Sequence, residues 1–250
     1  MKYTGERIVL ESPECAPDTV IFREHAERYK FASRFVKGKR VLDIACGVGY
    51  GSEILHSMGQ PQSIIGGDIS DEAVAYATQK YAGLTNVRFE RMNAEAIALD
   101  QESVDVVVSF ETIEHLPHVA DYLNSINKVL AKGGVYIVST PNRLVTHTEA
   151  TTVENPFHHH EFTIDELSTL LKKHFTIREV YYQRPYTPNV MTSAVGRISK
   201  WESVYRKVIP RFIRVDLRNR FWPDISTDVG IYPYKEPIRP LYFVFVCVKV

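Results

Sequence analysis

The stretch VLDIACGVGYGS, which runs from Val41 to Ser52, decides the fold of this chain. Residues 40–45 (RVLDIA) form a short apolar run that predicts a buried strand, and residues 50–58 predict a helix. Gly47 and Gly49 stand between the two. Glycines at such a turn let the backbone approach a ligand closely at the N-terminus of the helix. The stretch therefore predicts a strand, a ligand-binding turn and a helix in succession.

The rest of the chain repeats this alternation. Further strands are expected at residues 62–69, 87–92, 104–110, 135–140, 175–182 and 241–250. Helices are expected after Ser70, over residues 119–130, and after the capping box of Thr163 and Glu166. The alternation predicts an α/β fold with a doubly wound, mostly parallel sheet of seven strands. Ligands of such sheets bind beyond the carboxyl ends of the strands, so the first, second and fourth strand ends are the places to search for chemistry.

The composition is that of a single globular domain of 250 residues and 28.6 kDa. Basic and acidic residues number 30 each, so a surface built to bind nucleic acid is not expected. The three cysteines, Cys15, Cys46 and Cys247, show neither a disulfide framework nor a zinc spacing. The N-terminus lacks an apolar signal region, and no run approaches the roughly 18 apolar residues of a membrane span. We therefore expect a cytoplasmic protein.

Two ligands compete for the glycine turn, a dinucleotide and S-adenosylmethionine (SAM). Asp43 stands four residues before Gly47. Its carboxylate would repel the pyrophosphate of a dinucleotide, whereas it attracts the ammonium group of the methionine part of SAM. Ser52 also occupies the position of the third glycine in the dinucleotide spacing. Asp68, at the end of the second strand, can accept hydrogen bonds from ribose hydroxyls of either ligand. Asp43 thus favours SAM.

Four motifs in order carry a resemblance that covers about residues 1–182. VLDIACGVGYGS, IIGGDIS, MNAEAI and the pair FETIEHLP and GGVYIVSTPN resemble those of class I SAM-dependent methyltransferases. Asn93 stands where that family usually has Asp, and its amide oxygen can still accept a hydrogen bond from the adenine amine. The resemblance implies SAM as the cofactor, bound by Asp43, Ala45, Gly47, Gly49, Asp68, Ile69, Asn93, Ala94, Glu95 and Phe110.

A finer resemblance concerns the acceptor. YTGER (Tyr3 to Arg7), EHAERYKFA, FETIEHLP, STPNR and NPFHHHEFT together resemble methyltransferases found beside glycosyltransferases in surface-glycan gene clusters. This resemblance implies O-methylation of a sugar hydroxyl on a glycan, a nucleotide sugar or a related natural product.

Acidic residues and histidines gather after the fourth and fifth strands. Glu111, Glu114 and His115 follow residues 104–110, and three histidines, His158 the first of them, precede Glu161. His115 or His158 can serve as a general base near neutral pH. Alternatively, Glu111, Glu114, His115 and His158 bind a divalent metal, Mg or Mn, or these residues have only a structural role. The cluster resembles the metal site of small-RNA 3′-terminal 2′-O-methyltransferases, and it also resembles ubiquinone-pathway O-methyltransferases, so both activities are alternatives.

Two segments outside the core motifs have expected roles. Residues 1–37 are expected to form a helical lid in which His25 and Tyr29 share one helix face and close over SAM, while Arg7 pairs with the SAM carboxylate. The alternative is a surface helix packed by Phe31 and Phe35. Residues 183–239 are expected to form an insertion between the last two strands that recognises the acceptor. Nine basic and two acidic residues lie between Arg184 and Arg220. Such an arm suits a glycan or small-molecule acceptor, a lipid carrier at a membrane surface, or a second copy of the chain, and RNA less well.

Overall fold

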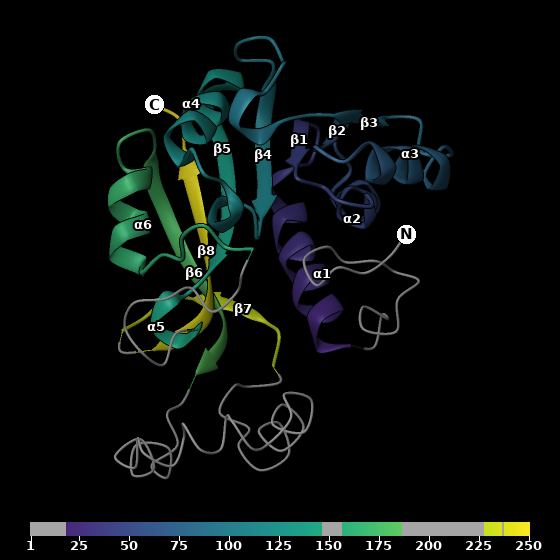
Figure 1. The fold of residues 1–250 in the computed structure, drawn as a ribbon. Helices are drawn as coiled ribbons and strands as arrows, with labels where there is room; N and C mark the ends of the chain where they lie inside the picture. The colour runs from purple at the N-terminus through teal and green to yellow at the C-terminus, as the bar shows by residue number, and fades with distance from the viewer. Residues whose placement is uncertain (1–18, 147–156, 187–227, 237) are drawn as a thin grey trace.

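The computed structural model describes residues 19–146, 157–186, 228–236 and 238–250 (Figure 1). The strands are β1 Arg40–Ile44, β2 Ser63–Asp68, β3 Val87–Arg91, β4 Val104–Phe110, β5 Leu130–Pro141, β6 Thr176–Tyr186, β7 Ile231–Pro233 and β8 Arg239–Val248. The helices are α1 Val20–Ala32, α2 Tyr50–Gly59, α3 Asp71–Lys80, α4 Val119–Val129, α5 Arg143–Thr146 and α6 Ile164–Leu171, and the short 3-10 turns are Ser33–Phe35, Ala94–Ala96 and Ile113–His115.

These elements form one sheet in the order β3-β2-β1-β4-β5-β8-β6-β7. Strands β1 to β5 are all parallel to one another, and β8 inserts antiparallel between β5 and β6. The predicted fold class is confirmed. The strand order reverses between β1 and β4, which makes the carboxyl ends of these two strands the expected ligand position.

The sheet has one strand more than the seven that the pattern predicts. The additional strand, β7, is only three residues long, and two of its residues are exposed, so it carries no alternation that a sequence pattern can detect. It pairs with β6, which itself extends to Tyr186. Parts of the expected insertion at 183–239 therefore belong to the sheet, while residues 187–227 lie outside the described residues.

Two apolar layers cover the two faces of the sheet. Leu42 of β1 packs in one cluster with residues of α4 and α6, whereas its neighbour Val41 packs in another with residues of α1 and α2. Successive residues of a strand point to opposite faces, so β1 supplies both layers. Figure 1 shows α4 and α6 with the β5 side of the sheet and α1 beside β4. Within the described residues, no helix has both the length and the apolar character needed to cross a membrane.

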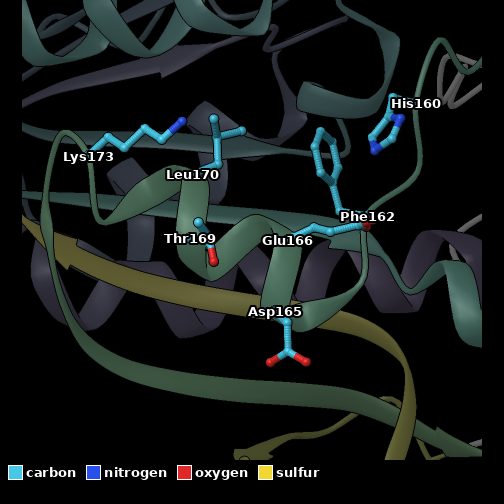
Figure 2. Close-up of a pocket in the computed structure, with 7 residues that line it drawn as sticks. All are labelled: His160, Phe162, Asp165, Glu166, Thr169, Leu170 and Lys173. Carbon is cyan, nitrogen blue, oxygen red and sulfur yellow. The ribbon is translucent and has the colours of Figure 1, made fainter.

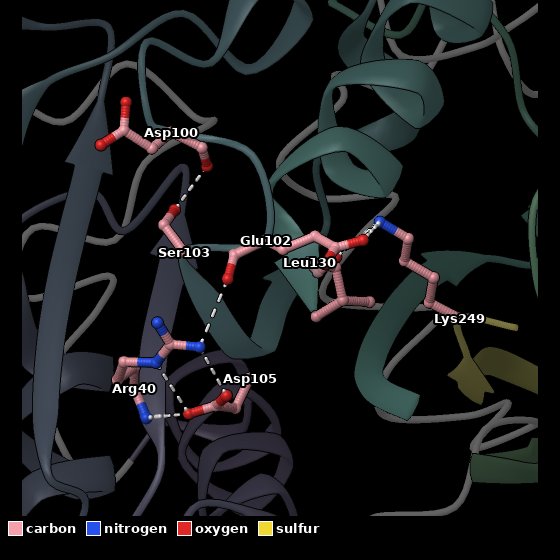
Figure 3. A network of polar contacts seen from close by, with 7 residues as sticks. All are labelled: Arg40, Asp100, Glu102, Ser103, Asp105, Leu130 and Lys249. Carbon is pink, nitrogen blue, oxygen red and sulfur yellow. Dashed lines mark hydrogen bonds and ion pairs between the residues drawn. The ribbon is translucent and has the colours of Figure 1, made fainter. Parts of the chain in front are cut away.

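A polar network ties together the ends of the strands opposite the predicted site (Figure 3). Arg40, which begins β1, donates from Nε and Nη2 to the two carboxylate oxygens of Asp105 at 3.1 and 2.8 Å. This pairing lowers the pKa of Asp105. Lys249, just after β8, donates to the carbonyl oxygens of Asn127 and Leu130 at 2.7 Å each. These contacts fix the amino-terminal edge of the sheet, and the carboxyl edge holds the residues of the predicted site.

Candidate functional site

The turn between β1 and α2 has the backbone that the glycines predict. Ala45, Gly47 and Gly49 all have positive φ angles, at 61°, 56° and 83°. A Cβ atom at Gly49 would also lie 2.8 Å from the ring of Phe89. The turn therefore requires glycine at position 49 for its backbone and for its packing. It leads directly into the first turn of α2 at Tyr50.

Asp43, near the end of β1, is completely buried and accepts two hydrogen bonds. Its Oδ1 atom accepts from the Tyr29 hydroxyl at 3.0 Å, and its Oδ2 atom accepts from the Ser52 hydroxyl at 2.6 Å. Burial raises the pKa of Asp43 to about 7. In the sequence, Ser52 stands out only as a departure from the dinucleotide spacing. Ser52 lies in the first turn of α2, nine residues after Asp43. This position is the signal that could have predicted its hydrogen bond to the Asp43 carboxylate.

Asp68 connects the end of β2 to the glycine turn. Its two carboxylate oxygens accept hydrogen bonds from the backbone N–H groups of Gly47 and Ser70, each at 2.9 Å. The next residue, Ile69, is 58% exposed although its side chain is large and apolar. An exposed aliphatic side chain next to a buried carboxylate is suited to a nucleoside, which presents an apolar base face and ribose hydroxyls.

The motif after β3 holds the adjoining loop together. Asn93 accepts a hydrogen bond from the backbone N–H of Glu95 at 3.0 Å, and the Glu95 carboxylate accepts one from the backbone N–H of His118 at 2.7 Å. Ala94 is buried beside them. Asn93 and Glu95 thus have structural hydrogen bonds in addition to the predicted contact with the cofactor. Of the residues predicted to bind it, Arg7 lies outside the described residues.

Helix α1 packs against the glycine turn. The Tyr29 ring makes edge contacts with Phe110 and Tyr50, with centroids 5.0 and 5.7 Å apart. The His25 ring contacts the Tyr50 hydroxyl through Nδ1 at 3.1 Å. Burial lowers the pKa of His25 well below its usual range, so the ring is neutral. A Cβ atom at Gly51 would lie 2.0 Å from the Tyr29 ring, so α1 can pack this closely only against glycine.

Three of the four predicted metal ligands come together after β4. One ligand atom each from Glu114, His115 and His158 lie within 4.8 Å of one another. Glu114 is fully buried; its Oε2 atom accepts from the Thr140 hydroxyl at 3.0 Å, and its Oε1 atom has no hydrogen-bond partner within the described part of the chain. Burial, and then the neighbouring Glu111 carboxylate, raise the pKa of Glu114. Glu111 stands apart from this group, and it accepts a hydrogen bond from the Ser139 hydroxyl at 2.6 Å.

The two histidines of this group are held by their Nδ1 atoms. His115 Nδ1 lies 3.1 Å from the carbonyl oxygen of Phe157, and His158 Nδ1 lies 2.6 Å from Oε1 of Glu161. Because both partners are acceptors, each Nδ1 atom carries a proton, so a lone pair on either ring can only be on Nε2. The rings meet edge to face with centroids 4.6 Å apart.

Glu161 is a residue of this site that the sequence argument missed. Its side chain is buried, and its Oε2 atom accepts a hydrogen bond from the Thr146 hydroxyl while Oε1 contacts His158. The spacing of three residues between His158 and Glu161 is the signal that could have identified it. The rings of His159 and His160 are exposed, and only their backbone N–H groups bond to the Glu114 carbonyl oxygen.

A separate hollow lies on the outer face of α6 (Figure 2). Its volume is about 470 Å³, and it is lined by His160, Phe162, Asp165, Glu166, Thr169, Leu170 and Lys173. It is open to solvent, and its charged residues are of both signs. None of the predicted cofactor, catalytic or metal residues lines it, so it is not part of the site built above.

Comparisons with solved structures agree with the fold. The YcgJ protein of Bacillus subtilis has a TM-score of 0.60 at 16% identity, over 91% of this chain and 98% of that one. An S-adenosylmethionine-dependent methyltransferase of Mesorhizobium loti has a TM-score of 0.58 at 18% identity, over 92% of this chain and 100% of that one. At these identities the likeness supports the fold alone.

Sequence comparisons concern the family. A family model described as a methyltransferase domain matches residues 35–201. A probable S-adenosylmethionine-dependent methyltransferase of Mycolicibacterium smegmatis is 36% identical over 169 residues, which are 68% of this chain and 63% of that protein. One of Mycobacterium tuberculosis is 34% identical over 67% of this chain and 58% of that protein, so the match spans less than two thirds of either relative. A ubiquinone biosynthesis O-methyltransferase of Sinorhizobium fredii is 36% identical over 109 residues, 43% of each protein. With the carboxylates at the ends of β1 and β2, these matches establish that the chain belongs to the class I SAM-dependent methyltransferase family.

Proposed function

We propose that this protein transfers the methyl group of SAM to the oxygen of an acceptor hydroxyl, and that the acceptor is a sugar. The observation that carries the first part is the cluster of Glu114, His115 and His158, since carboxylate and imidazole groups are suited to activating a hydroxyl. The O-methyltransferase name of the Sinorhizobium fredii relative supports it. The sugar rests on the resemblance to glycan-cluster methyltransferases, and the cytoplasm, where activated sugars are made, is the proposed compartment.

The cofactor is proposed to lie across the carboxyl ends of β1, β2 and β3. Asp68 would accept hydrogen bonds from the ribose hydroxyls, and Ile69 would cover one face of adenine. Asp43 is proposed to attract the methionine ammonium, with Tyr29 and Ser52 holding its carboxylate in a fixed orientation. The sulfonium methyl group would then face the end of β4, where the acidic and histidine cluster begins.

Methyl transfer from a sulfonium is an in-line displacement whose leaving group is a neutral thioether. The leaving group needs no proton, so the protein has two tasks, to align the acceptor oxygen and to remove its proton. The Nε2 lone pair of His158 is proposed to take that proton. Glu161 would hold the ring in the required tautomer and stabilise the imidazolium that forms, because its carboxylate contacts Nδ1.

The same cluster fits a divalent metal. Among the described residues, the buried Oε1 atom of Glu114 has no hydrogen-bond partner, and the Nδ1 contacts of His115 and His158 orient both rings, as the hydrogen bonds behind metal-binding histidines do. Two imidazoles and one carboxylate favour Mn²⁺ over Mg²⁺, which prefers oxygen ligands. When bound, such a metal would lower the pKa of the acceptor hydroxyl.

Two other acceptors are alternatives with a specific observation behind each. The ubiquinone biosynthesis O-methyltransferase relatives favour a small-molecule acceptor of the quinone pathway, which a catechol represents in the assay below. The Glu114, His115 and His158 cluster favours the 3′-terminal 2′-hydroxyl of a small RNA, although the zero net charge of the chain argues against nucleic acid.

Methyl-labelled SAM tests these proposals in one assay. The protein is incubated with nucleotide sugars, oligosaccharides, a catechol or a small RNA, and the labelled atom is identified by mass spectrometry. Label on a sugar oxygen supports the proposal; label only on the catechol or the RNA selects that alternative, and transfer to nitrogen or carbon contradicts O-methylation.

Turnover that is undiminished after EDTA treatment would contradict the proposed metal site. His115→Ala should slow turnover, whereas the matched variant His159→Ala should not, since the His159 ring is exposed.

A further inference from the structure

Arg28 of α1 is a buried charge that the proposed mechanism does not use. Its side chain is 0% exposed. One guanidinium nitrogen, Nη1, donates to Oε1 of Gln183 at 2.7 Å, whereas the buried Nε and Nη2 atoms have no hydrogen-bond partner among the residues that the structure describes. Buried donors are nearly always paired, and charged donors most of all, so two unpaired donors on one guanidinium require an explanation.

The unpaired edge is the one that binds oxyanions in pairs of hydrogen bonds. The Nε–H and Nη2–H groups of arginine point in parallel, and this fork matches the oxygens of a carboxylate or a phosphate. Gln183 fixes the fork in place. Its Nε2 atom donates to the carbonyl oxygens of Glu24 and Val229 at 3.0 and 2.7 Å, so its Oε1 atom must face Arg28. The guanidinium is thus oriented with its Nη1 atom occupied and its fork unpaired.

The carboxylates near Arg28 make their hydrogen bonds elsewhere. Glu24 pairs with Arg184, and Glu111 accepts from the Ser139 hydroxyl. Both favour the charged form of Arg28, but no hydrogen bond joins either of them to it. The Tyr242 ring lies 4.7 Å from the guanidinium carbon and stabilises the cation. The positive charge is therefore stabilised although no described residue forms a direct ion pair with the fork.

Arg28 lies near the carboxyl ends of β4 and β5, on the side of the site that is proposed for the acceptor. Tyr242 lies opposite Pro141 at the carboxyl end of β5, and Glu111 directly follows β4. The residues proposed to bind the cofactor lie instead at the carboxyl ends of β1, β2 and β3. Arg28 is next to Tyr29 in sequence. Helix α1 therefore contacts Asp43, the residue proposed to bind the SAM ammonium, through Tyr29, and it contacts Tyr242 through Arg28.

We propose that the Arg28 fork binds an oxyanion of the methyl acceptor, a carboxylate or a phosphate, through two parallel hydrogen bonds. This inference rests on the proposed sugar O-methylation and narrows it. The acceptor is then an acidic sugar, either a uronic acid or a sugar phosphate, and a neutral sugar is a poor substrate.

Anion binding can be tested without knowing the acceptor. The protein saturated with S-adenosylhomocysteine is titrated with sodium phosphate, sodium acetate or sodium chloride at equal ionic strength. The NMR cross-peak of the Arg28 Nε–H group, assigned by its loss in Arg28→Lys, reports binding. Phosphate or acetate should shift it saturably and chloride should not. Arg23→Lys, a change at an exposed position of the same helix, should leave the response intact. An unshifted cross-peak, or a shift that chloride reproduces, would overturn the proposal whether or not a sugar is methylated.

Matched acceptors distinguish the source of the anion. Glucuronate is compared with glucose, and glucose 1-phosphate with methyl glucoside, in the labelled-SAM assay. Arg28→Gln should lower kcat/KM for the charged member by about 10- to 100-fold and leave the neutral member unchanged. Calorimetry with S-adenosylhomocysteine verifies that this variant is folded. A loss of S-adenosylhomocysteine affinity of the same size would show that the fork serves the cofactor carboxylate, and it would overturn the proposal. If no sugar is methylated, the proposed function fails. The phosphate titration then still shows whether the Arg28 fork binds an oxyanion.

Discussion

The Glu161 carboxylate lies 2.6 Å from Nδ1 of His158, and both side chains are largely shielded from solvent. This pairing requires a proton on Nδ1 and leaves the lone pair on Nε2, the form that a base or a metal ligand needs. Glu161 is therefore a positioning residue for His158.

Removal of the Glu161 carboxylate should lower kcat while SAM affinity is retained. We expect Glu161→Ala to reduce kcat by about 10- to 100-fold, because His158 loses both its fixed tautomer and a partner for its positive charge. Glu161→Gln should restore part of the rate, and Asp165→Asn at the exposed start of α6 should be neutral. A full rate in Glu161→Ala would remove Glu161 from the mechanism.

SAM affinity should rise with pH. Burial raises the pKa of Asp43 to about 7, so its carboxyl group is mostly protonated at pH 6 and mostly ionised at pH 8. Only the ionised form attracts the SAM ammonium, and affinity scales with the fraction of the binding-competent form. The dissociation constant should therefore fall by about tenfold between pH 6 and pH 8, with proton release on binding at pH 6. Calorimetry in buffers of different ionisation enthalpy measures both quantities.

5′-Methylthioadenosine provides the control for this pH dependence. It has the nucleoside and the thioether but lacks the amino-acid tail, so its affinity should be nearly constant over the same range. An equal pH dependence for both ligands would show that it does not come from an attraction between Asp43 and the SAM ammonium, and it would contradict that contact.

Gly51→Ala should disturb the packing of α1 on the glycine turn. The added Cβ atom would lie 2.0 Å from the Tyr29 ring and must displace it, together with its hydrogen bond to Asp43. Overpacking of this kind destabilises a protein by about 1–3 kcal/mol, which urea unfolding can measure. SAM binding should weaken as well. Gly83→Ala is the matched control, since no atom lies within 4 Å of its Cβ position. Equal stability of the two variants would contradict the described packing.

The sequence predicts those parts of the molecule that depend on local pattern. The glycine turn, the buried strands and the capping box of Thr163 all follow from neighbouring residues, and the structure has each of them. The roles of Arg28 and Gln183 do not, because these residues are 155 positions apart and meet only once the sheet has formed. Short β7 is missed for the same reason, since its pairing with β6 is all that defines it.

A crystal structure with S-adenosylhomocysteine tests the central claim most directly, namely that the carboxyl ends of β1 and β2 bind the cofactor through Asp43 and Asp68. We predict ribose hydroxyls within hydrogen-bond distance of the Asp68 carboxylate and the ligand ammonium next to Asp43, directly or through one water. A ligand bound elsewhere, or one whose ammonium lies far from Asp43 while its adenine leaves Ile69 exposed, would contradict the account.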